Sequence, residues 1–176
     1  MHRIRRLATI AMIVMLPMML YYPYHALSWN LEVSFLDPGK WTRNDRWVDR
    51  DAQIAMTTRI VFFTMWAVPV VLGFLGYVAG FWALILLRQG IVFDTRISRR
   101  LSVMGIMIFS SSTLALLAGA LSPMVRSWHN ADGPLLLRFW YSSGDVGLAF
   151  CGLAFLFLGL VMREAIRIAR ENEEFI

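Results

Sequence analysis

Four apolar stretches alternate with polar segments along the chain. They cover residues 7–27, 60–87, 101–122 and 146–162. A transmembrane helix needs about 20 mostly apolar residues, so each stretch is long enough, or nearly so, to cross a membrane. The last one is short, and we expect its helix to continue through residues 163–174. The pattern predicts an all-α, polytopic membrane protein in which a bundle of four transmembrane helices forms a single domain, residues 1–176.

Composition strengthens this prediction. Of the residues, 58% are hydrophobic and 16% are charged, against about 25% charged residues in soluble globular domains. The net charge of +5 would be compatible with nucleic acid binding. The arginines flank the apolar stretches, however, so membrane topology explains them, and no nucleic acid binding is expected. Cys151 is the only cysteine, which excludes an intramolecular disulfide, and its place in an apolar stretch predicts a small core residue.

The first stretch has two interpretations. Arg3, Arg5 and Arg6 precede it in the manner of the basic region of a signal peptide. The stretch is long for such a peptide, however, and Tyr24, two positions before Ala26, stands where cleavage would require a small residue. We therefore expect an uncleaved transmembrane helix.

The distribution of arginine predicts the orientation in the membrane. Basic residues outnumber acidic ones before the first stretch, between the second and third, and directly after the fourth. The segments 28–59 and 123–145 carry balanced charge instead. Because short loops rich in arginine stay in the cytoplasm, we expect cytoplasmic termini, a cytoplasmic loop at 88–100 and a cytoplasmic tail at 163–176, with 28–59 as an outer loop. The expected location is the bacterial inner membrane.

The loop at 88–100 holds the candidate docking residues for a partner protein. Arg96, Arg99 and Arg100 are close enough on a helix to form one docking face. Fixing the topology is the simpler role, and lysine would fulfil it equally well. Gly90 is placed to end the second helix. The candidate N-caps of the third are Asp94, Thr95 and Ser98.

Small and hydroxyl residues mark two faces inside the apolar stretches. Gly73, Gly76 and Gly80 form a stripe in the second stretch, and the last two have the spacing that lets another helix approach closely. We expect helix packing within the chain, with a homo-oligomer interface as the alternative. Ser110, Ser111, Ser112 and Thr113 follow each other in the third stretch. We expect them to bond carbonyls of their own helix rather than line a solute path.

Ionisable residues are absent from the centre of every apolar stretch, which argues against a proton pump or an ion-coupled transporter. The three histidines do not form the facing pairs that a bis-histidine haem needs, so no cofactor is expected. Asp45 and Asp49 lie one helical turn apart in the outer loop and raise a metal site as an alternative. Arg43, Arg46 and Arg50 are interleaved with them, so ion pairs are the simpler account. No catalytic constellation or metal site is predicted, and we expect no enzymatic activity.

A set of short motifs gives the chain a family resemblance. The four stretches are combined with Gly90-x-x-Phe93, then Arg100-Leu101 and Gly105, and with the closing segment ARENEEFI. In these features the chain resembles the bacterial membrane family called domain of unknown function 2975. Members are often encoded beside a small helix-turn-helix regulator, so the resemblance implies a membrane partner for a repressor. It implies no catalytic residues, since none are established in that family.

The function expected from these observations is binding rather than catalysis. We expect a small integral membrane protein that binds a partner, with sensing at its outer loop and signalling at its arginine loop. The expected partners are the lipid bilayer and a cytoplasmic helix-turn-helix regulator. An accessory subunit of a larger membrane complex is the alternative, and a small-solute transporter or a membrane enzyme is less favoured.

Overall fold

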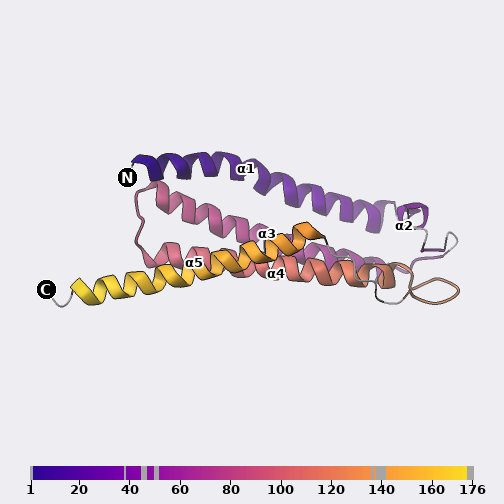
Figure 1. Ribbon diagram of the computed structural model, residues 1–176. Coiled ribbons are helices and arrows are strands. Elements are labelled where there is room, and N and C mark those ends of the chain that lie inside the picture. The colour runs from indigo at the N-terminus through magenta and orange to yellow at the C-terminus, as the bar shows by residue number, and fades with distance from the viewer. Residues whose placement is uncertain are drawn as a thin grey trace.

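Four long helices make up most of the computed structural model (Figure 1). The structure describes residues 2–37, 39–44, 47–49, 52–135, 137 and 142–173. In chain order the elements are α1 (His2–Leu31), a π-helical continuation η1 (Glu32–Leu36), α2 (Gly39–Asn44), α3 (Met56–Arg88), α4 (Thr95–Arg126) and α5 (Ser143–Glu173). The described residues contain no strand, so the all-α prediction is confirmed. Four of the helices are long and apolar enough to cross a membrane.

The helices extend further into the predicted loops than the apolar stretches alone indicate. The loop predicted at 88–100 narrows to residues 89–94, because α4 begins at Thr95. Arg96, Arg99 and Arg100 therefore belong to the first turns of α4, and Arg88 is the last residue of α3. The outer loop predicted at 28–59 likewise loses its ends to α1 and α3. α5 continues through the polar segment to Glu173, as the sequence predicted.

The long helices pack in chain order. α1 lies against α3, α3 against α4, and α4 against α5, while no extensive contact joins α1 to α4 or α5 in the described part of the chain. The four predicted helices are thus arranged as an open series rather than as a closed ring. Each terminal helix has a single long neighbour and leaves much of its apolar surface uncovered, which suits a protein surrounded by lipid.

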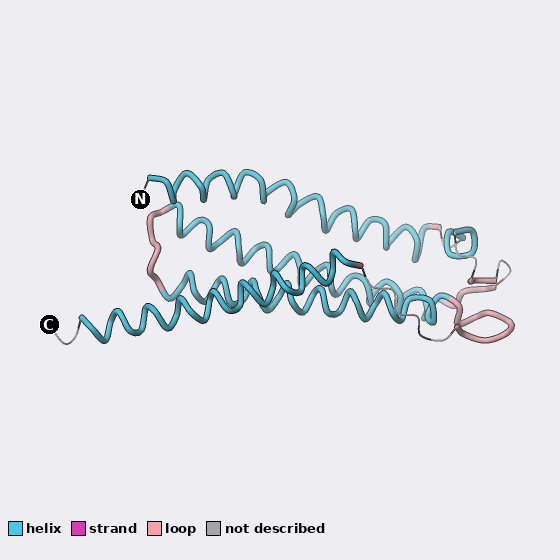
Figure 2. Tube along the Cα trace, viewed as in Figure 1, coloured by secondary structure: helices cyan, strands magenta, loops and turns pink. Residues whose placement is uncertain are grey.

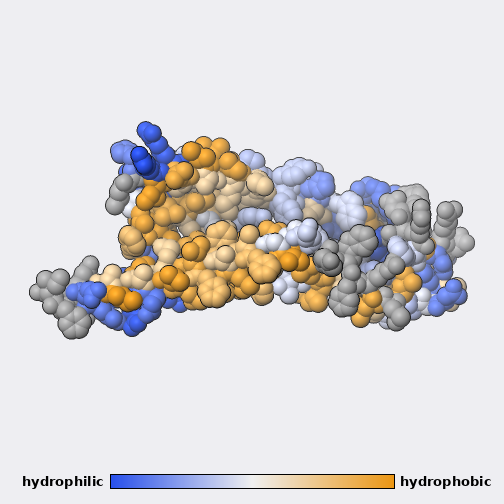
Figure 3. All heavy atoms as spheres, viewed as in Figure 1, coloured by the Kyte–Doolittle hydropathy of each residue, from blue (hydrophilic) through white to orange (hydrophobic). Residues whose placement is uncertain are grey.

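The two ends of the series differ in what they carry. Figure 1 places the N-terminus, the α3–α4 connection and the C-terminal part of α5 at one end, where α5 projects beyond the other helices. We call this the arginine end. Figure 2 shows that the α3–α4 connection is a single loop, whereas the longer loops and α2 gather at the opposite end, the loop end. In the view of Figure 3, hydrophobic residues dominate between hydrophilic ends.

The glycine stripe of α3 packs within the chain. Gly73, Gly76 and Gly80 are buried, and their neighbours lie mainly on α4. A Cβ atom built onto Gly76 would lie 3.0 Å from a side-chain carbon of Ile108. One built onto Gly80 would lie 2.7 Å from the sulfur of Met104. The small side chains let α3 and α4 approach closely, so this face is not available to a second copy of the chain.

A second and closer contact joins α4 to α5. We call it the α4–α5 seam; its members are Ser98, Ser102 and Gly105 of α4 with Gly152 and Gly159 of α5. A Cβ atom on Gly152 would lie 2.6 Å from the backbone nitrogen of Phe109, and one on Gly105 would lie 2.6 Å from the carbonyl oxygen of Gly152. Backbone therefore meets backbone here, at a distance that any side chain would prevent. The two α5 glycines are seven positions apart, so they lie on the same face of the helix.

Candidate functional site

The short α3–α4 connection is fixed by backbone hydrogen bonds at both of its ends. The N–H of Gly90 donates to the carbonyl of Leu87 at 3.0 Å, and that of Ile91 to Leu86 at 3.2 Å. Gly90 has a φ of 87°, the left-handed conformation that glycine adopts most readily. This pair of bonds is a Schellman motif, which ends α3 and satisfies its last carbonyls. The predicted C-terminal role of Gly90 is therefore confirmed.

Asp94 begins α4 and holds the first of the three arginines. Its carboxylate accepts the backbone N–H of Arg96 at 2.7 Å, and the Arg96 guanidinium donates from Nη2 to Oδ2 at 3.0 Å and from Nε to Oδ1 at 3.2 Å. Of the three candidate N-caps, Asp94 is the residue used. The side-chain bonds from Arg96, followed by the backbone bond, lower the pKa of this carboxyl below its ordinary value. It therefore stays ionised at neutral pH.

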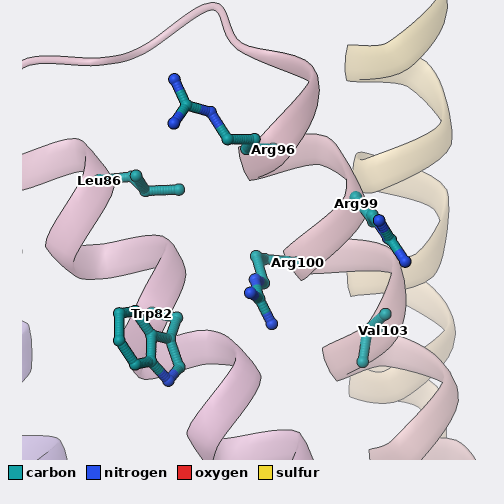
Figure 4. Close-up of a pocket in the computed structure, with 6 residues that line it drawn as sticks. All are labelled: Trp82, Leu86, Arg96, Arg99, Arg100 and Val103. Carbon is teal, nitrogen blue, oxygen red and sulfur yellow. The ribbon is translucent and has the colours of Figure 1, made fainter.

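The three arginines point in different directions from α4 (Figure 4). Arg96 is held by Asp94. Arg100 points toward α3, where its guanidinium lies 6.0 Å from the ring centre of Trp82. Arg99 projects from α4 away from Trp82. Residues three and four positions apart leave the same side of a helix, so the three arginines start from one face of α4 and their guanidinium groups spread apart from there.

The three side chains help to line a pocket between the end of α3 and the start of α4. Its volume is about 500 Å³. We call it the arginine pocket, and its lining residues are Trp82, Leu86, Arg96, Arg99, Arg100 and Val103. Trp82 is half-exposed. The pocket combines guanidinium groups with apolar walls, an arrangement suited to a ligand with an anionic and an apolar part.

The N-terminal arginines reach the same end of the molecule. The Nη2 atom of Arg5 donates to the carbonyl of Gln89 at 3.4 Å, and a Cβ atom on Gly90 would lie 2.6 Å from it. A cation is favourable at the C-terminal end of a helix dipole, so Arg5 ties α1 to the end of α3. A further pocket of about 400 Å³ lies beside it, lined by His2, Arg5, Arg6, Thr9, Ile10 and Arg88. This contact was not predicted, because no local pattern connects residues 84 positions apart.

At the loop end, the carboxylate of Asp49 binds backbone. Its carboxylate accepts the N–H of Ala131 at 2.8 Å, and its own N–H donates to the side chain of Asn130 at 3.0 Å. The described residues contain no cluster of three or more potential metal ligands. Asp45, Arg46 and Arg50, which the metal and ion-pair alternatives also involved, lie outside the described residues, as does the side chain of Arg43.

Aromatic residues also gather at the loop end. Trp41 is fully buried against Phe62, with ring centres 4.8 Å apart, and Arg126 lies over both rings. The nearby cavity, between α1, α3 and the end of α4, has a volume of about 440 Å³. These contacts close the first outer segment onto the helices. Within the described part of the chain, this end is a packed cap.

Two residues within the apolar stretches differ from expectation. Cys151, predicted as a core residue, is exposed on α5. The prediction was wrong because α5 contacts only one long helix, so most of its faces are uncovered. Thr113 bonds its own helix at Phe109 as expected, but the Ser111 hydroxyl donates across to the carbonyl of Pro69 on α3 at 2.7 Å. Ser111 thus joins α3 and α4.

Comparison with known proteins places the chain in a family. The profile described as "Protein of unknown function (DUF2975)" matches residues 46–176. The chain belongs to this family. The match covers α3, α4 and α5, and the resemblance seen in the sequence is confirmed. No curated protein and no solved structure matches the chain.

Proposed function

We propose that this DUF2975 protein is a non-enzymatic membrane protein that binds a partner at its arginine end. The observation that carries the proposal is an uncompensated basic cluster beside an exposed aromatic residue. Among the described residues, Arg99 and Arg100 have no acidic partner within ion-pair distance. Phe93, in the adjoining loop, is 82% exposed. Aromatic residues and arginines are the residue types that most often contribute binding energy at protein interfaces.

The projecting part of α5 offers a second surface at the same end. Arg167 pairs with Glu164 and Glu171 along the helix, and Ile168 is exposed. Ion pairs of this spacing stabilise a helix that has no neighbour to pack against. The extension is therefore a preformed helix, available to a partner without a large ordering cost.

The chemistry of the arginine end favours a partner with an acidic surface. Guanidinium groups bind carboxylates with paired hydrogen bonds. The family resemblance adds a soluble helix-turn-helix regulator as the proposed partner. In this proposal the membrane protein holds the regulator at the bilayer and releases it when the loop end receives a signal.

The orientation is part of the proposal and has its own test. The arginine end lies in the cytoplasm of a bacterial cell, with the protein in the inner membrane, because arginine-rich short segments are retained there. Reporter fusions after Arg96 and after Glu173 are expected to be cytoplasmic, and a fusion after Thr42 periplasmic. A cytoplasmic reporter signal at Thr42 would overturn the orientation.

Partner binding is tested by replacing Arg96, Arg99 and Arg100 together with lysine. The net charge and the topology are then unchanged, since lysine retains loops in the cytoplasm equally well, but the paired bonds of the guanidinium are lost. We expect normal amounts of protein in the membrane and loss of the co-purifying soluble partner. The matched control replaces Arg3, Arg5 and Arg6 with lysine and is expected to keep the partner. Retention of the partner by both variants would leave these arginines with a topological role alone.

An accessory subunit of a larger membrane complex is the second candidate. It is favoured by the open helix series, in which α1 and α5 each leave a broad apolar face for other membrane helices. The two candidates differ in what co-purifies from gently solubilised membranes. If this protein is an accessory subunit, we expect it to migrate with large membrane proteins. If it is the membrane partner of a soluble regulator, we expect it to migrate with one small soluble protein.

A further inference from the structure

We propose that the arginine pocket binds the phosphate group of one anionic phospholipid from the membrane leaflet at the arginine end. The proposal rests on the proposed function only for the cytoplasmic position of this end. It adds a lipid ligand on the side of α4 that faces α3, and it shares Arg96, Arg99 and Arg100 with the partner proposal.

The depth of the pocket matches the boundary between lipid headgroups and acyl chains. Trp82 precedes the end of α3 at Arg88 by six positions, about 9 Å along a helix. Val103 lies about 12 Å inside the start of α4 at Thr95, by the same rise per residue. Trp82 and Val103 thus lie deeper than Arg96, Arg99 and Arg100, which are within about 8 Å of the start of α4. Tryptophan is the residue type most typical of this boundary.

The charges around the pocket are incomplete without an anion. The acidic residue nearest the arginines, Asp94, is already bound to Arg96 by side-chain and backbone bonds. Arg100 has the ring of Trp82 as its neighbour on α3, and no carboxylate of the described residues pairs with it. A guanidinium at the edge of a low-dielectric region gains stability from a counter-charge. A phosphodiester supplies two oxygens that match the guanidinium fork.

The apolar walls distinguish a lipid from a soluble anion. Leu86 and Val103 line the pocket together with Trp82, which is 51% exposed. Acyl chains of a bound lipid would continue from the pocket along this surface without leaving the membrane. Inorganic phosphate would leave the walls unfilled. Basic pockets between transmembrane helices on the cytoplasmic side are a recurring site for anionic headgroups.

The test uses the purified full chain in a neutral detergent, with bound lipids counted by native mass spectrometry. Phosphatidylglycerol and phosphatidylcholine of equal chain length are titrated separately. We expect one phosphatidylglycerol to bind at least about tenfold more tightly than phosphatidylcholine, the ratio that about 1.4 kcal/mol produces. Equal affinity for the two lipids would overturn the proposal. Displacement of the lipid by millimolar inorganic phosphate would assign the pocket to a soluble anion instead.

Substitutions locate the binding to the pocket. Arg100→Gln is expected to weaken phosphatidylglycerol binding about tenfold, since charge-assisted bonds are the stronger class of hydrogen bond. The matched control Arg163→Gln removes the same charge from an exposed position on α5 and is expected to leave the affinity within about twofold. An equal loss of affinity in both variants would mean that the lipid responds to general surface charge, and it would overturn the proposal that the pocket is the binding site.

A third variant separates the pocket from the fold. Trp82→Leu keeps an apolar residue on the lipid-facing surface, where little packing is lost, but removes the ring beside Arg100. We expect an unchanged thermal transition with weaker phosphatidylglycerol binding; unchanged binding would contradict the pocket geometry. Because no soluble partner is present in these titrations, their failure would leave the partner proposal standing. Loss of the soluble partner in the triple lysine variant, in turn, says nothing about lipid affinity in Arg100→Gln.

Discussion

α1 and α5 are both terminal helices of the series and have 30 and 31 residues, yet they are held in different ways. α5 meets α4 through backbone contacts at Gly105, Gly152 and Gly159. α1 contains no glycine and is rich in methionine, and its described buried residues are only Ala8 and Asn30. Flexible methionine side chains fill irregular gaps but do not let two backbones approach. Apolar length therefore makes both segments membrane helices, while small residues decide how closely each one packs.

The family match also separates α1 from the helices that pack closely. It begins at residue 46, after α1 and α2, and includes the α4–α5 seam and the arginine pocket. The part of the chain that carries the proposed lipid site is thus also the part with the closest helix packing. α1 is joined to it at the arginine end through Arg5 and at the opposite end through the packed cap. The comparison predicts that stability is concentrated in α3, α4 and α5.

The largest effect is expected from Gly152→Ala. Its new Cβ would lie 2.6 Å from the backbone nitrogen of Phe109, and a backbone cannot rotate aside as a side chain can. We expect a loss of more than about 3 kcal/mol in the free energy of unfolding, above the usual range for overpacking. The measurement is the thermal transition in detergent.

Gly147→Ala is the matched control for that substitution. It lies on the same helix, and a Cβ there meets nothing within 4 Å. Alanine is preferred over glycine in a helix by about 1 kcal/mol, so this variant is expected to be neutral or slightly stabilised. Equal melting temperatures for the two variants would show that the helices of the seam can separate without a penalty.

An intermediate effect is expected from Gly76→Leu at the α3–α4 contact. The nearest atoms are side-chain atoms of Ile108 and Met107, although the backbone of Ile108 follows at 3.4 Å. Side chains yield in part, so we expect a loss of about 1–3 kcal/mol in the free energy of unfolding. An unchanged thermal transition would mean that α3 and α4 are not in contact through this face.

A small effect is expected from Gly80→Ala, where α1 contributes to the contact. The new Cβ would meet the flexible ends of Met104 and Met15, at 2.7 and 3.2 Å. Both side chains can adopt another rotamer, and the helix preference of alanine offsets part of the cost. We expect a change within about 1 kcal/mol. A loss as large as that of Gly152→Ala would remove the distinction between the loosely and the closely packed parts of the molecule.

The sequence predicted the elements better than their contacts. Hydrophobic length located the four membrane helices, and Gly90 and Asp94 marked the ends of the α3–α4 connection, because these signals are local. The seam was not identified, since Gly152 and Gly159 are separated by two helical turns and their partners lie on another helix. The arginine cluster was found, but not Trp82, which reaches the pocket only when α3 packs against α4. The exposure of Cys151 could not be read from its apolar surroundings, because apolar residues face lipid as well as the core.

The smallest effect is expected at Asp94, the N-cap of α4. Asp94→Ala removes both the N-cap of α4 and the ion pair with Arg96, whereas Asp94→Asn keeps an oxygen that can cap the helix. We expect the thermal transition to fall more in the alanine variant than in the asparagine variant.

The lowered pKa of the Asp94 carboxyl gives the pH dependence of this stabilisation its sign. The stabilisation is fully present above the unfolded pKa of about 3.9 and is lost as the pH falls through the lower folded value. The difference between the native chain and Asp94→Asn should therefore be constant from pH 7 to about 5 and shrink only below about pH 4. A difference that already shrinks near pH 6 would mean that the carboxyl is not held in its ionised form by Arg96.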